Sequence, residues 1–269
     1  MSNRPRLERI RAIIQKIGSS NLRDIGYQKL RRGIEDTFWH IKGNTKLGCN
    51  GLHAIFDSTR GSNYRKIKWR YKTESEVVED LLYELRQDDV YYDVGAGFGL
   101  HTCLPAKKLT KGRVVSIEPY PPHMEQVKKN VELNNLDNVI TIELALSDSS
   151  GDVNFNEEYS ALTSEKTNLK VETSRGDRLV SRTKVPSPTA IKIDVEGSEP
   201  LVIEGLKETL RREGCRLLYC EVHLPSNHRP SVEDFGMNLP TLKRRLKNFG
   251  FSITTLKRRN TEIFLKGKK

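Results

Sequence analysis

The sequence predicts an α/β protein built on a doubly wound, mostly parallel sheet, and three observations support this. An apolar run over residues 90–94 ends in an acid and a glycine-rich turn, Gly95-Ala96-Gly97-Phe98-Gly99. Residues 191–199 follow a similar pattern, with a short strand that ends at Asp194 where a helix begins. Strand and helix patterns alternate around these two segments. Because such sheets bind ligands at the carboxyl ends of their strands, we expect both ends to share one ligand crevice.

The first 72 residues are expected to form a basic, partly helical extension, and residues 73–269 the main domain. Apolar residues recur at helical spacing among arginines over residues 7–17, which predicts a short amphipathic helix. This helix would either pack on its own domain or lie on an anionic membrane. Residues 43–63 are rich in Gly, Asn and Ser and are expected to be a loop-rich lead-in.

The main domain is expected to begin with a helix from Thr73 whose buried face includes Val77, Leu81 and Leu85. The next elements are expected in this order: strand 90–94, helix 102–109, strand 113–117, a helix from Pro121 to Leu133, and strand 139–144.

The second half is expected to contain a short strand at 151–155 and a polar, irregular segment at 157–189. Such a long loop just before a central strand predicts a lid over the site. A helix over 199–212, a strand over 216–222 and a helix over 239–249 follow, and Gly250 ends the last helix. Residues 251–256 and 262–266 are expected to close the sheet as an antiparallel pair.

Composition is typical of a soluble globular protein. Of 269 residues, 36% are hydrophobic, the mean hydropathy is −0.60, and no apolar run approaches the roughly 20 residues that cross a bilayer. The first residues lack an apolar signal core, so we expect a cytoplasmic protein. Cys49, Cys103, Cys215 and Cys220 match no zinc or redox spacing, which predicts free thiols. No metal site is predicted.

Positive charge is concentrated at the two chain ends. The chain carries a formal charge of +11; residues 1–33 hold nine basic against two acidic residues, and residues 243–269 hold ten against one. The stretch between them is net acidic. The ends therefore either contact an anionic partner, such as a membrane surface, or form an ordinary solvated surface.

The glycine turn indicates which cofactor the crevice holds. A dinucleotide fingerprint requires glycine at position 100, where this chain has Leu100. Asp93, just before the turn, would repel a pyrophosphate but suits a cationic ligand such as S-adenosylmethionine. Glu118 ends the next strand, where a carboxylate accepts the ribose hydroxyls of a nucleoside, and Ala145 is placed for backbone contacts to an adenine ring.

Four motifs together resemble the FkbM-type family of S-adenosylmethionine-dependent methyltransferases: the turn from Asp93 to Gly99, Glu118-Pro119, Ala145 to Asp148, and Ile191 to Glu199. The resemblance covers residues 75–225. It implies a Rossmann-like class I methyltransferase fold with a seven-stranded sheet and a reversed last strand. It also implies a cofactor bound by Gly95, Ala96, Gly97 and Gly99, and methyl transfer to a hydroxyl, often of a sugar. Gly97 departs from the family, which more often has Asn there.

In the fold that the resemblance implies, Asp194 and His223 lie at neighbouring strand ends beside the sulfonium. His223 is the expected general base, because neutral imidazole is available near pH 7, and the alternative is a core or capping histidine. Asp194 would hold the sulfonium side or orient the acceptor. Glu196 would touch substrate or cap the next helix, and Glu199 would only charge that helix's first turn. His228 and Arg229 would contact an anionic acceptor. A metal ion held by Asp194 with nearby acids is left as an alternative.

The function expected from these features is O-methylation of a hydroxyl or carboxyl group on a sugar, glycan or other small molecule. The basic ends would hold the enzyme near a lipid-linked or anionic acceptor, peripheral to a membrane. Two alternatives are an RNA methyltransferase and a cofactor-binding scaffold without catalysis. An N-P-P-Y-like tetrad, common in base-amine methyltransferases, is missing after Ile193, where the chain has Asp194-Val195-Glu196-Gly197.

Overall fold

A computed structural model describes residues 43–182, 185–226 and 229–269, together with Glu8, Ala12, 33–34, 36–38 and His40. The helix expected over residues 7–17 lies almost wholly outside the described residues. The chain divides into two compact units, Met1–Ser75 and Glu76–Lys269, and helix α3 (Gly61–Glu84) begins in the first and ends in the second.

The first unit contains a β-hairpin where the sequence suggested a loop-rich lead-in. Strands β1 (Asn44–Cys49) and β2 (Leu52–Asp57) pair antiparallel, with Cys49 opposite Leu52. The turn between them is Asn50-Gly51, and both residues have positive φ, 50° and 80°. Asn-Gly is the dipeptide that two-residue hairpin turns prefer, because both tolerate the left-handed region. The lead-in prediction was therefore wrong. The start of the next helix was also misplaced, since α3 begins at Gly61 and not at Thr73.

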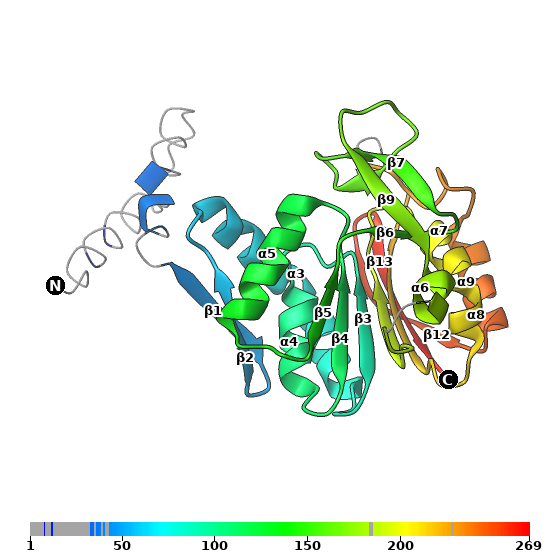
Figure 1. Ribbon diagram of the computed structural model, residues 1–269, viewed down its shortest axis with the longest axis horizontal. Coiled ribbons are helices and arrows are strands. Elements are labelled where there is room, and N and C mark those ends of the chain that lie inside the picture. Colours follow the sequence, from blue (N-terminus) through cyan, green and yellow to red (C-terminus); the bar gives the residue numbers. More distant parts are fainter. Residues whose placement is uncertain are drawn as a thin grey trace. The chain divides into compact units, whose positions relative to one another are not determined.

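The second unit is built on a seven-stranded sheet with the order β12-β13-β11-β10-β3-β4-β5 (Figure 1). Its strands are β3 (Val90–Val94), β4 (Arg113–Ile117), β5 (Val139–Ile142), β10 (Ala190–Ile193), β11 (Leu217–His223), β12 (Ser252–Arg259) and β13 (Glu262–Lys268). The pairs among β5, β4, β3, β10 and β11 are parallel, and β13 is antiparallel to both its neighbours. This is the predicted class I methyltransferase topology with its reversed last strand.

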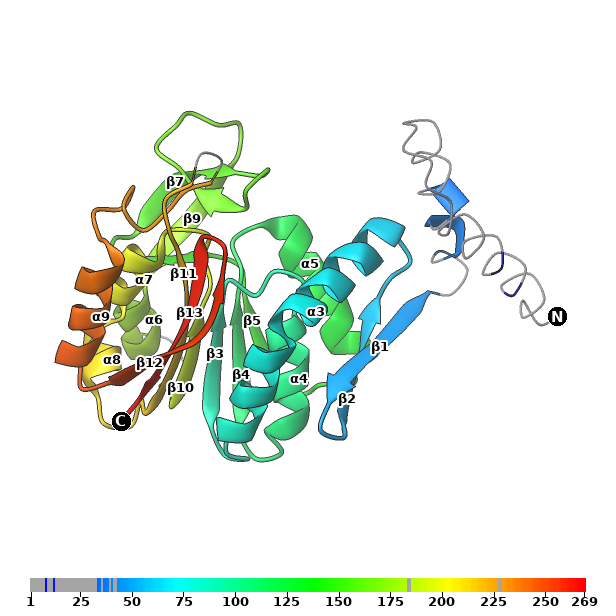
Figure 2. The ribbon, with the colours of Figure 1, turned by 180° about the vertical axis from the view of Figure 1, so that it is seen from behind.

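Helices cover both faces of this sheet, as Figures 1 and 2 show from opposite sides. Helices α4 (Leu100–Lys108) and α5 (Pro121–Leu133) lie on one face with the C-terminal part of α3. Helices α6 (Gly176–Arg182), α7 (Glu199–Gly205), α8 (Lys207–Arg211) and α9 (Leu239–Asn248) lie on the other. Among the described residues, no helix is long and apolar enough to span a bilayer.

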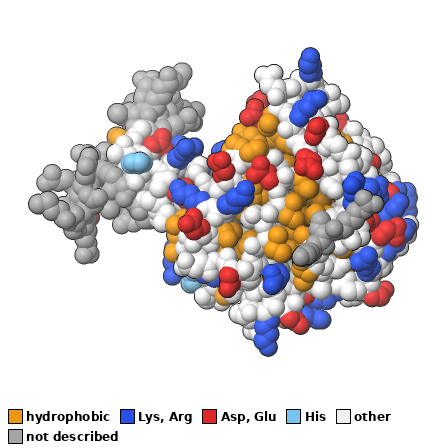
Figure 3. Space-filling view, in the orientation of Figure 1, with side chains coloured by type: hydrophobic (Ala, Val, Ile, Leu, Met, Phe, Trp, Pro, Cys, Tyr) orange, Lys and Arg blue, Asp and Glu red, His pale blue; other side chains and the backbone are white. Residues whose placement is uncertain are grey.

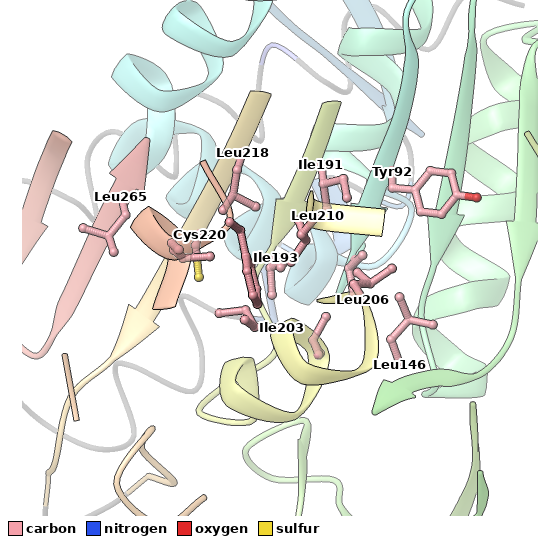
Figure 4. Close-up of a cluster of buried hydrophobic side chains, with 14 of the residues drawn as sticks. Tyr92, Leu146, Ile191, Ile193, Ile203, Leu206, Leu210, Leu218, Cys220 and Leu265 are labelled. Carbon is pink, nitrogen blue, oxygen red and sulfur yellow. The ribbon is translucent and has the colours of Figure 1, made fainter. Parts of the chain in front are cut away.

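The larger core fills the space between the sheet and α7 to α9. Ile191 and Ile193 of β10 pack there with Leu218, Cys220 and Leu206, and all five side chains are buried (Figure 4). Successive strand residues point to opposite faces, so the residue between the two isoleucines, Lys192, faces the other side of the sheet. That side carries the polar residues of the site.

The segment over residues 157–189 is more ordered than the sequence predicted. Strands β8 (Ala161–Leu162) and β9 (Lys170–Arg175) lie in it, followed by α6. With β6 (Ala145–Ser147) and β7 (Gly151–Asn156) they form a four-stranded sheet in the order β6-β9-β7-β8. The expectation of an irregular segment was therefore wrong, and its role as a lid stays a prediction.

Candidate active site

The carboxyl ends of four parallel strands bring the predicted site residues to one edge of the sheet. Asp93 lies in β3, Glu118 follows β4, Asp194 follows β10, and His223 is the last residue of β11. Since β4, β3, β10 and β11 are consecutive neighbours in the sheet, these four side chains come from adjacent positions. All four residues are at least 96% buried, which places charged groups in a low-dielectric interior.

The glycine turn after β3 depends on a close approach of two strands. Gly95 has a φ of 79°, and a Cβ atom added there would lie 1.8 Å from the backbone oxygen of Asp194. Any side chain would therefore push β3 and β10 apart at the site. Gly97 has a φ of 55°, a region that asparagine also adopts, so glycine here does not by itself require a turn different from that of the family. Gly99 caps α4 in the left-handed conformation.

Glu118 ties the two loops at the ends of β3 and β4 together. Its Oε2 accepts a hydrogen bond from the backbone N–H of Gly97 at 2.8 Å, and its Oε1 accepts one from the N–H of Tyr120 at 3.0 Å. Each carboxylate oxygen can accept two hydrogen bonds, so each keeps capacity for one further donor. Ribose hydroxyls fit that capacity, and the ribose contact stays a prediction.

Four aromatic rings pack in series beside Glu118, an arrangement that the sequence did not predict. The ring of His123 lies 4.8 Å from Phe98 and 4.9 Å from Tyr120, between centroids, and Tyr120 stacks on Phe155 at 5.6 Å. Such faces are suited to stacking with a nucleoside base. The only sequence signal was the spacing of Phe98 and Tyr120 next to the glycine turn and the acid.

Asp93 has partners within the protein. Its Oδ2 accepts a hydrogen bond from Thr102 at 2.7 Å, and Lys192 Nζ lies 3.4 Å from its Oδ1. The same ammonium donates to Asp194 Oδ2 at 3.2 Å. Lys192 therefore joins the two acids of β3 and β10. Sequence reasoning missed it, although a lysine two residues before Asp194 on a strand must share its face.

His223 is held between two glutamates. Its Nδ1 lies 2.8 Å from Glu199 Oε1, and its Nε2 lies 3.4 Å from Glu196 Oε2. Burial by itself would lower the pKa of His223, but Glu199, and then Glu196 and Asp194, raise it from 6.5 to about 10. The ring is therefore expected to be cationic at neutral pH, which differs from the neutral imidazole expected from the sequence.

Glu199 does more than charge the first turn of a helix, so that prediction was wrong. Its side chain is completely buried, and its Oε1 also accepts a hydrogen bond from the backbone N–H of Gly197 at 3.0 Å. Glu196 has a positive φ of 51° and is partly exposed, and it makes no cap for α7, whose N-cap residue is Ser198. The two glutamates therefore each contact one ring nitrogen of His223.

Of the remaining predicted contacts, Arg229 lies at the rim of this centre and Ala145 lies in another sheet. Ala145 is buried at the start of β6, in the smaller sheet, opposite Thr173. Arg229 is half exposed, with Nη1 3.6 Å from Glu196 and 3.2 Å from Glu262. His228 lies outside the described residues. Within the described part of the chain, two groups could hold a metal ion: Asp194, Glu196 and His223, and Glu221, His223 and Glu262.

A separate cavity of about 350 Å³ lies on the opposite side, between α7, α8 and α9. It is lined by Lys207, Arg211, Arg244 and Arg245 among others and contains none of the predicted site residues. Figure 3 shows basic side chains gathered at the edge where α8 and α9 lie. Glu204 pairs with both Lys207 and Arg245, so part of this charge is compensated internally. Strand-end chemistry, and not cavity size, identifies the candidate site.

Comparison with known proteins agrees with this geometry. The FkbM methyltransferase domain matches residues 93–253. The hexuronic acid methyltransferase AglP of Haloferax volcanii is 32% identical over 163 residues, which are 58% of this chain and 66% of that protein. The chain thus spans just under two thirds of this relative.

Two solved structures are also similar to this chain. M. jannaschii TYW2 in complex with AdoMet has a TM-score of 0.47 at 16% identity, covering 84% of this chain and 87% of that chain. The O-methyltransferase from Bacillus cereus in complex with SAH has a TM-score of 0.45 at 17% identity, covering 73% and 81%.

Proposed function

Since the chain belongs to the FkbM family of S-adenosylmethionine-dependent methyltransferases, we propose that it methylates an oxygen atom of a hexuronic acid, free or within a glycan. The observation that carries the proposal is the 32% identity to a relative named as a hexuronic acid methyltransferase. The matched family segment, residues 93–253, contains all the strand-end residues described above.

The donor side of the site consists of the glycine turn and Glu118. S-adenosylmethionine supplies a methyl group that the neighbouring positive sulfur makes electrophilic. Backbone groups of Gly95, Ala96, Gly97 and Gly99 would approach its amino-acid part, and Glu118 would accept the ribose hydroxyls. Support comes from the unused acceptor capacity of Glu118 and from the aromatic rings beside it. Ala145 would approach the adenine.

The acceptor side consists of Asp194, His223, Glu196 and Arg229. Both ring nitrogens of His223 face carboxylates, so we assign this residue to positioning the acceptor and not to removing its proton. Methyl transfer is an in-line displacement, for which alignment of the acceptor oxygen is the main requirement. A uronate carboxylate is already ionised at neutral pH and requires no base. Arg229, half exposed at the rim, would pair with it, and His228 is a neighbouring proposed contact.

Label transfer from methyl-labelled S-adenosylmethionine tests this proposal. The protein is incubated with glucuronate-containing oligosaccharides, with the same oligosaccharides after reduction of their carboxyl groups to alcohols, and with RNA. We expect label in the uronate fraction only. Release of the label as methanol by mild alkali would identify an ester, and retention would identify an ether. Label in RNA, or equal label in the reduced oligosaccharides, would contradict the proposal.

An Arg229→Gln variant examines the acceptor side. It removes the guanidinium that faces Glu196 while leaving the glycine turn and Glu118 unchanged. We expect KM for the uronate to rise about tenfold, as for loss of one charge-assisted hydrogen bond, with unchanged affinity for S-adenosylmethionine. Lys128→Gln, an exposed basic residue of α5 paired with Glu143, is the matched control and should change neither.

A further inference from the structure

Three side chains converge at the ends of β10 and β11. One ligand atom each from Asp194, Glu196 and His223 lies within 4.8 Å of the others. Ligands bonded to one ion at roughly 2.1 Å stand about 3 to 4 Å apart. The 3.4 Å between His223 Nε2 and Glu196 Oε2 already falls in that range. The group therefore needs only small side-chain adjustments to enclose a cation.

The histidine is oriented as metal-binding histidines are. Its Nδ1 is fixed by the completely buried carboxylate of Glu199 at 2.8 Å, which turns Nε2 toward Asp194 and Glu196. A carboxylate behind the ring, with the other nitrogen facing acidic ligands, is the arrangement that sets the tautomer and orientation of a ligand histidine. Glu199 is itself held by the N–H of Gly197.

Acidic side chains gather at this corner, and cations of the protein pair with some of them. Three carboxylates, Asp194, Glu196 and Glu199, surround one imidazole. Lys192 is shared between Asp194 and Asp93, and Arg229 is half exposed and shared with Glu262. The Oε2 atom of Glu199 is buried and accepts no hydrogen bond from any described residue. A buried carboxylate oxygen without a donor is costly, and a divalent ion held at the other ring nitrogen would stabilise the negative charge of Glu199.

The second group, Glu221, His223 and Glu262, is a poorer candidate. The guanidinium of Arg259 pairs with both of its glutamates, at 3.1 Å from Glu221 and in closer contact with Glu262. A metal ion bound to this group would have to displace Arg259 from both glutamates. This contrast favours the group of Asp194, Glu196 and His223.

We propose that Asp194, Glu196 and His223 bind one divalent metal ion at the acceptor side of the site. Once Nε2 of His223 has released its proton to solvent, two carboxylate oxygens and one imidazole nitrogen form a mixed set that suits Mn²⁺. The nitrogen makes the set less suited to Mg²⁺. Glu196 is one-fifth exposed at the rim and provides the path of entry. Glu199 is the positioning residue behind His223.

The ion would hold the acceptor, a step that rests on the proposed function. A hexuronate offers a carboxylate and neighbouring hydroxyls, which are hard oxygen ligands. In an acidic pocket these anionic groups would be repelled, and an ion bound to both sides removes that repulsion. Alignment of the uronate oxygen would then come from the protein ligands through the ion.

Direct titration of the metal-free full-length protein with MnCl₂ tests the site. Free Mn²⁺ is followed by electron paramagnetic resonance, without cofactor or acceptor. We expect about one bound ion per chain, with affinity at least tenfold weaker in His223→Ala and Glu196→Gln. Glu199→Gln should weaken it by about 10- to 100-fold, as for other residues behind a ligand histidine. Glu262→Gln is the matched control and should bind as the wild type does.

Thermal melting and S-adenosylmethionine binding identify variants that remain folded, and only those are compared. Absence of saturable Mn²⁺ binding to the wild type would overturn the proposal, as would wild-type affinity in a folded Glu196→Gln protein. A loss in Glu262→Gln equal to that in Glu196→Gln would assign the ion to the other group. Addition of glucuronate to the Mn²⁺ complex should change the bound-ion spectrum. An unchanged spectrum with intact metal binding would remove the acceptor role alone.

Discussion

Buried carboxylates at the site are held by partners that the chain itself supplies. Glu118 accepts two backbone N–H groups, Asp93 contacts Lys192 and Thr102, and Glu199 contacts His223. Charges that are fixed in this way lose little further freedom when a ligand arrives, which favours binding. Single substitutions at these positions should therefore act on affinity.

Replacing Glu118 with Gln should weaken S-adenosylmethionine binding by about tenfold or more. The amide has one acceptor oxygen, so it can serve only one of the N–H groups of Gly97 and Tyr120, and loss of a hydrogen bond to a charged group costs about 1.5–3 kcal/mol. Calorimetric titration measures the effect. Glu143→Gln, at an exposed acid after the next strand, should bind normally. Equal affinity in the two variants would show that Glu118 does not contact the cofactor.

The four cysteines should differ sharply in reactivity. Burial raises the pKa of Cys103 and of Cys215 to about 12 and raises the pKa of Cys220 as well, whereas Cys49 is only partly buried. At pH 8 a thiol with a pKa of 12 has about 10⁻⁴ of its population as reactive thiolate. Titration with Ellman's reagent should give one fast thiol in the native protein and four after unfolding. Two or more fast thiols would contradict the described burial.

At the scale of elements, the site exists because β3 and β10 approach closely at their carboxyl ends. The Gly95→Ala variant tests this approach, since its Cβ would lie 1.8 Å from the oxygen of Asp194 and its φ is 79°. We expect the free energy of unfolding to fall by at least about 2 kcal/mol, and cofactor binding to be lost. Urea denaturation measures the first quantity.

Gly214→Ala is the matched control for that change. An added Cβ there meets no atom within 4 Å, and its φ is outside the left-handed region, so stability should be unchanged or slightly higher. A Gly95→Ala protein as stable as Gly214→Ala would show that the strand ends are farther apart than described.

Strands and helices with clear periodicity could be predicted from the sequence, and short polar elements could not. The elements at 90–94, 113–117 and 121–133 were placed correctly because their apolar residues repeat at strand or helix spacing. The hairpin over residues 44–57 was missed because its Asn-Gly turn was taken as loop composition. Strand β9, Lys170–Arg175, is polar on its exposed face and pairs with partners that only tertiary structure reveals.

The sequence predicted which strand ends carry the site residues, but it did not predict the contacts between those residues and their neighbours. Asp93, Glu118, Asp194 and His223 follow from the position of acids and a histidine after buried strands. Lys192 and Glu199 act through contacts between neighbouring strands or between a strand and a helix. Such contacts depend on register, which one sequence does not give.

At the scale of the molecule, the basic C-terminal segment compensates acids of the same chain. Lys257 pairs with Glu76, Arg259 with Glu221, and Lys266 with Asp80 and Glu84. These ion pairs offset much of the negative charge of the segment that lies between the two basic chain ends. Contact of those ends with a membrane stays a prediction.

Lys266→Met should lower the free energy of unfolding by about 2 kcal/mol near neutral pH. Its side chain is 12% exposed, and its ammonium bridges Asp80 and Glu84 of α3. Lys247→Met, at an exposed position of α9, should cost under about 0.5 kcal/mol. Burial raises the pKa of Glu84, but its bonds to Lys266 and Lys268 outweigh that and lower it from its usual 4.5.

The destabilisation by Lys266→Met should therefore depend on pH. A carboxylate with a lowered folded-state pKa contributes stability above its unfolded value, and this is lost as pH falls through the folded value. The difference between wild type and Lys266→Met should be full at pH 7 and shrink below about pH 4.5. Denaturant unfolding at pH 7 and pH 3 measures it, and a difference that grows in acid would contradict the bridge.

We propose that the ends of β3, β4, β10 and β11 form one pocket for a cationic methyl donor. Isothermal titration of the purified full-length protein with S-adenosylmethionine, and separately with NAD, tests it most directly. We expect saturable binding of one S-adenosylmethionine per chain and no heat from NAD. Binding of NAD without binding of S-adenosylmethionine would contradict it.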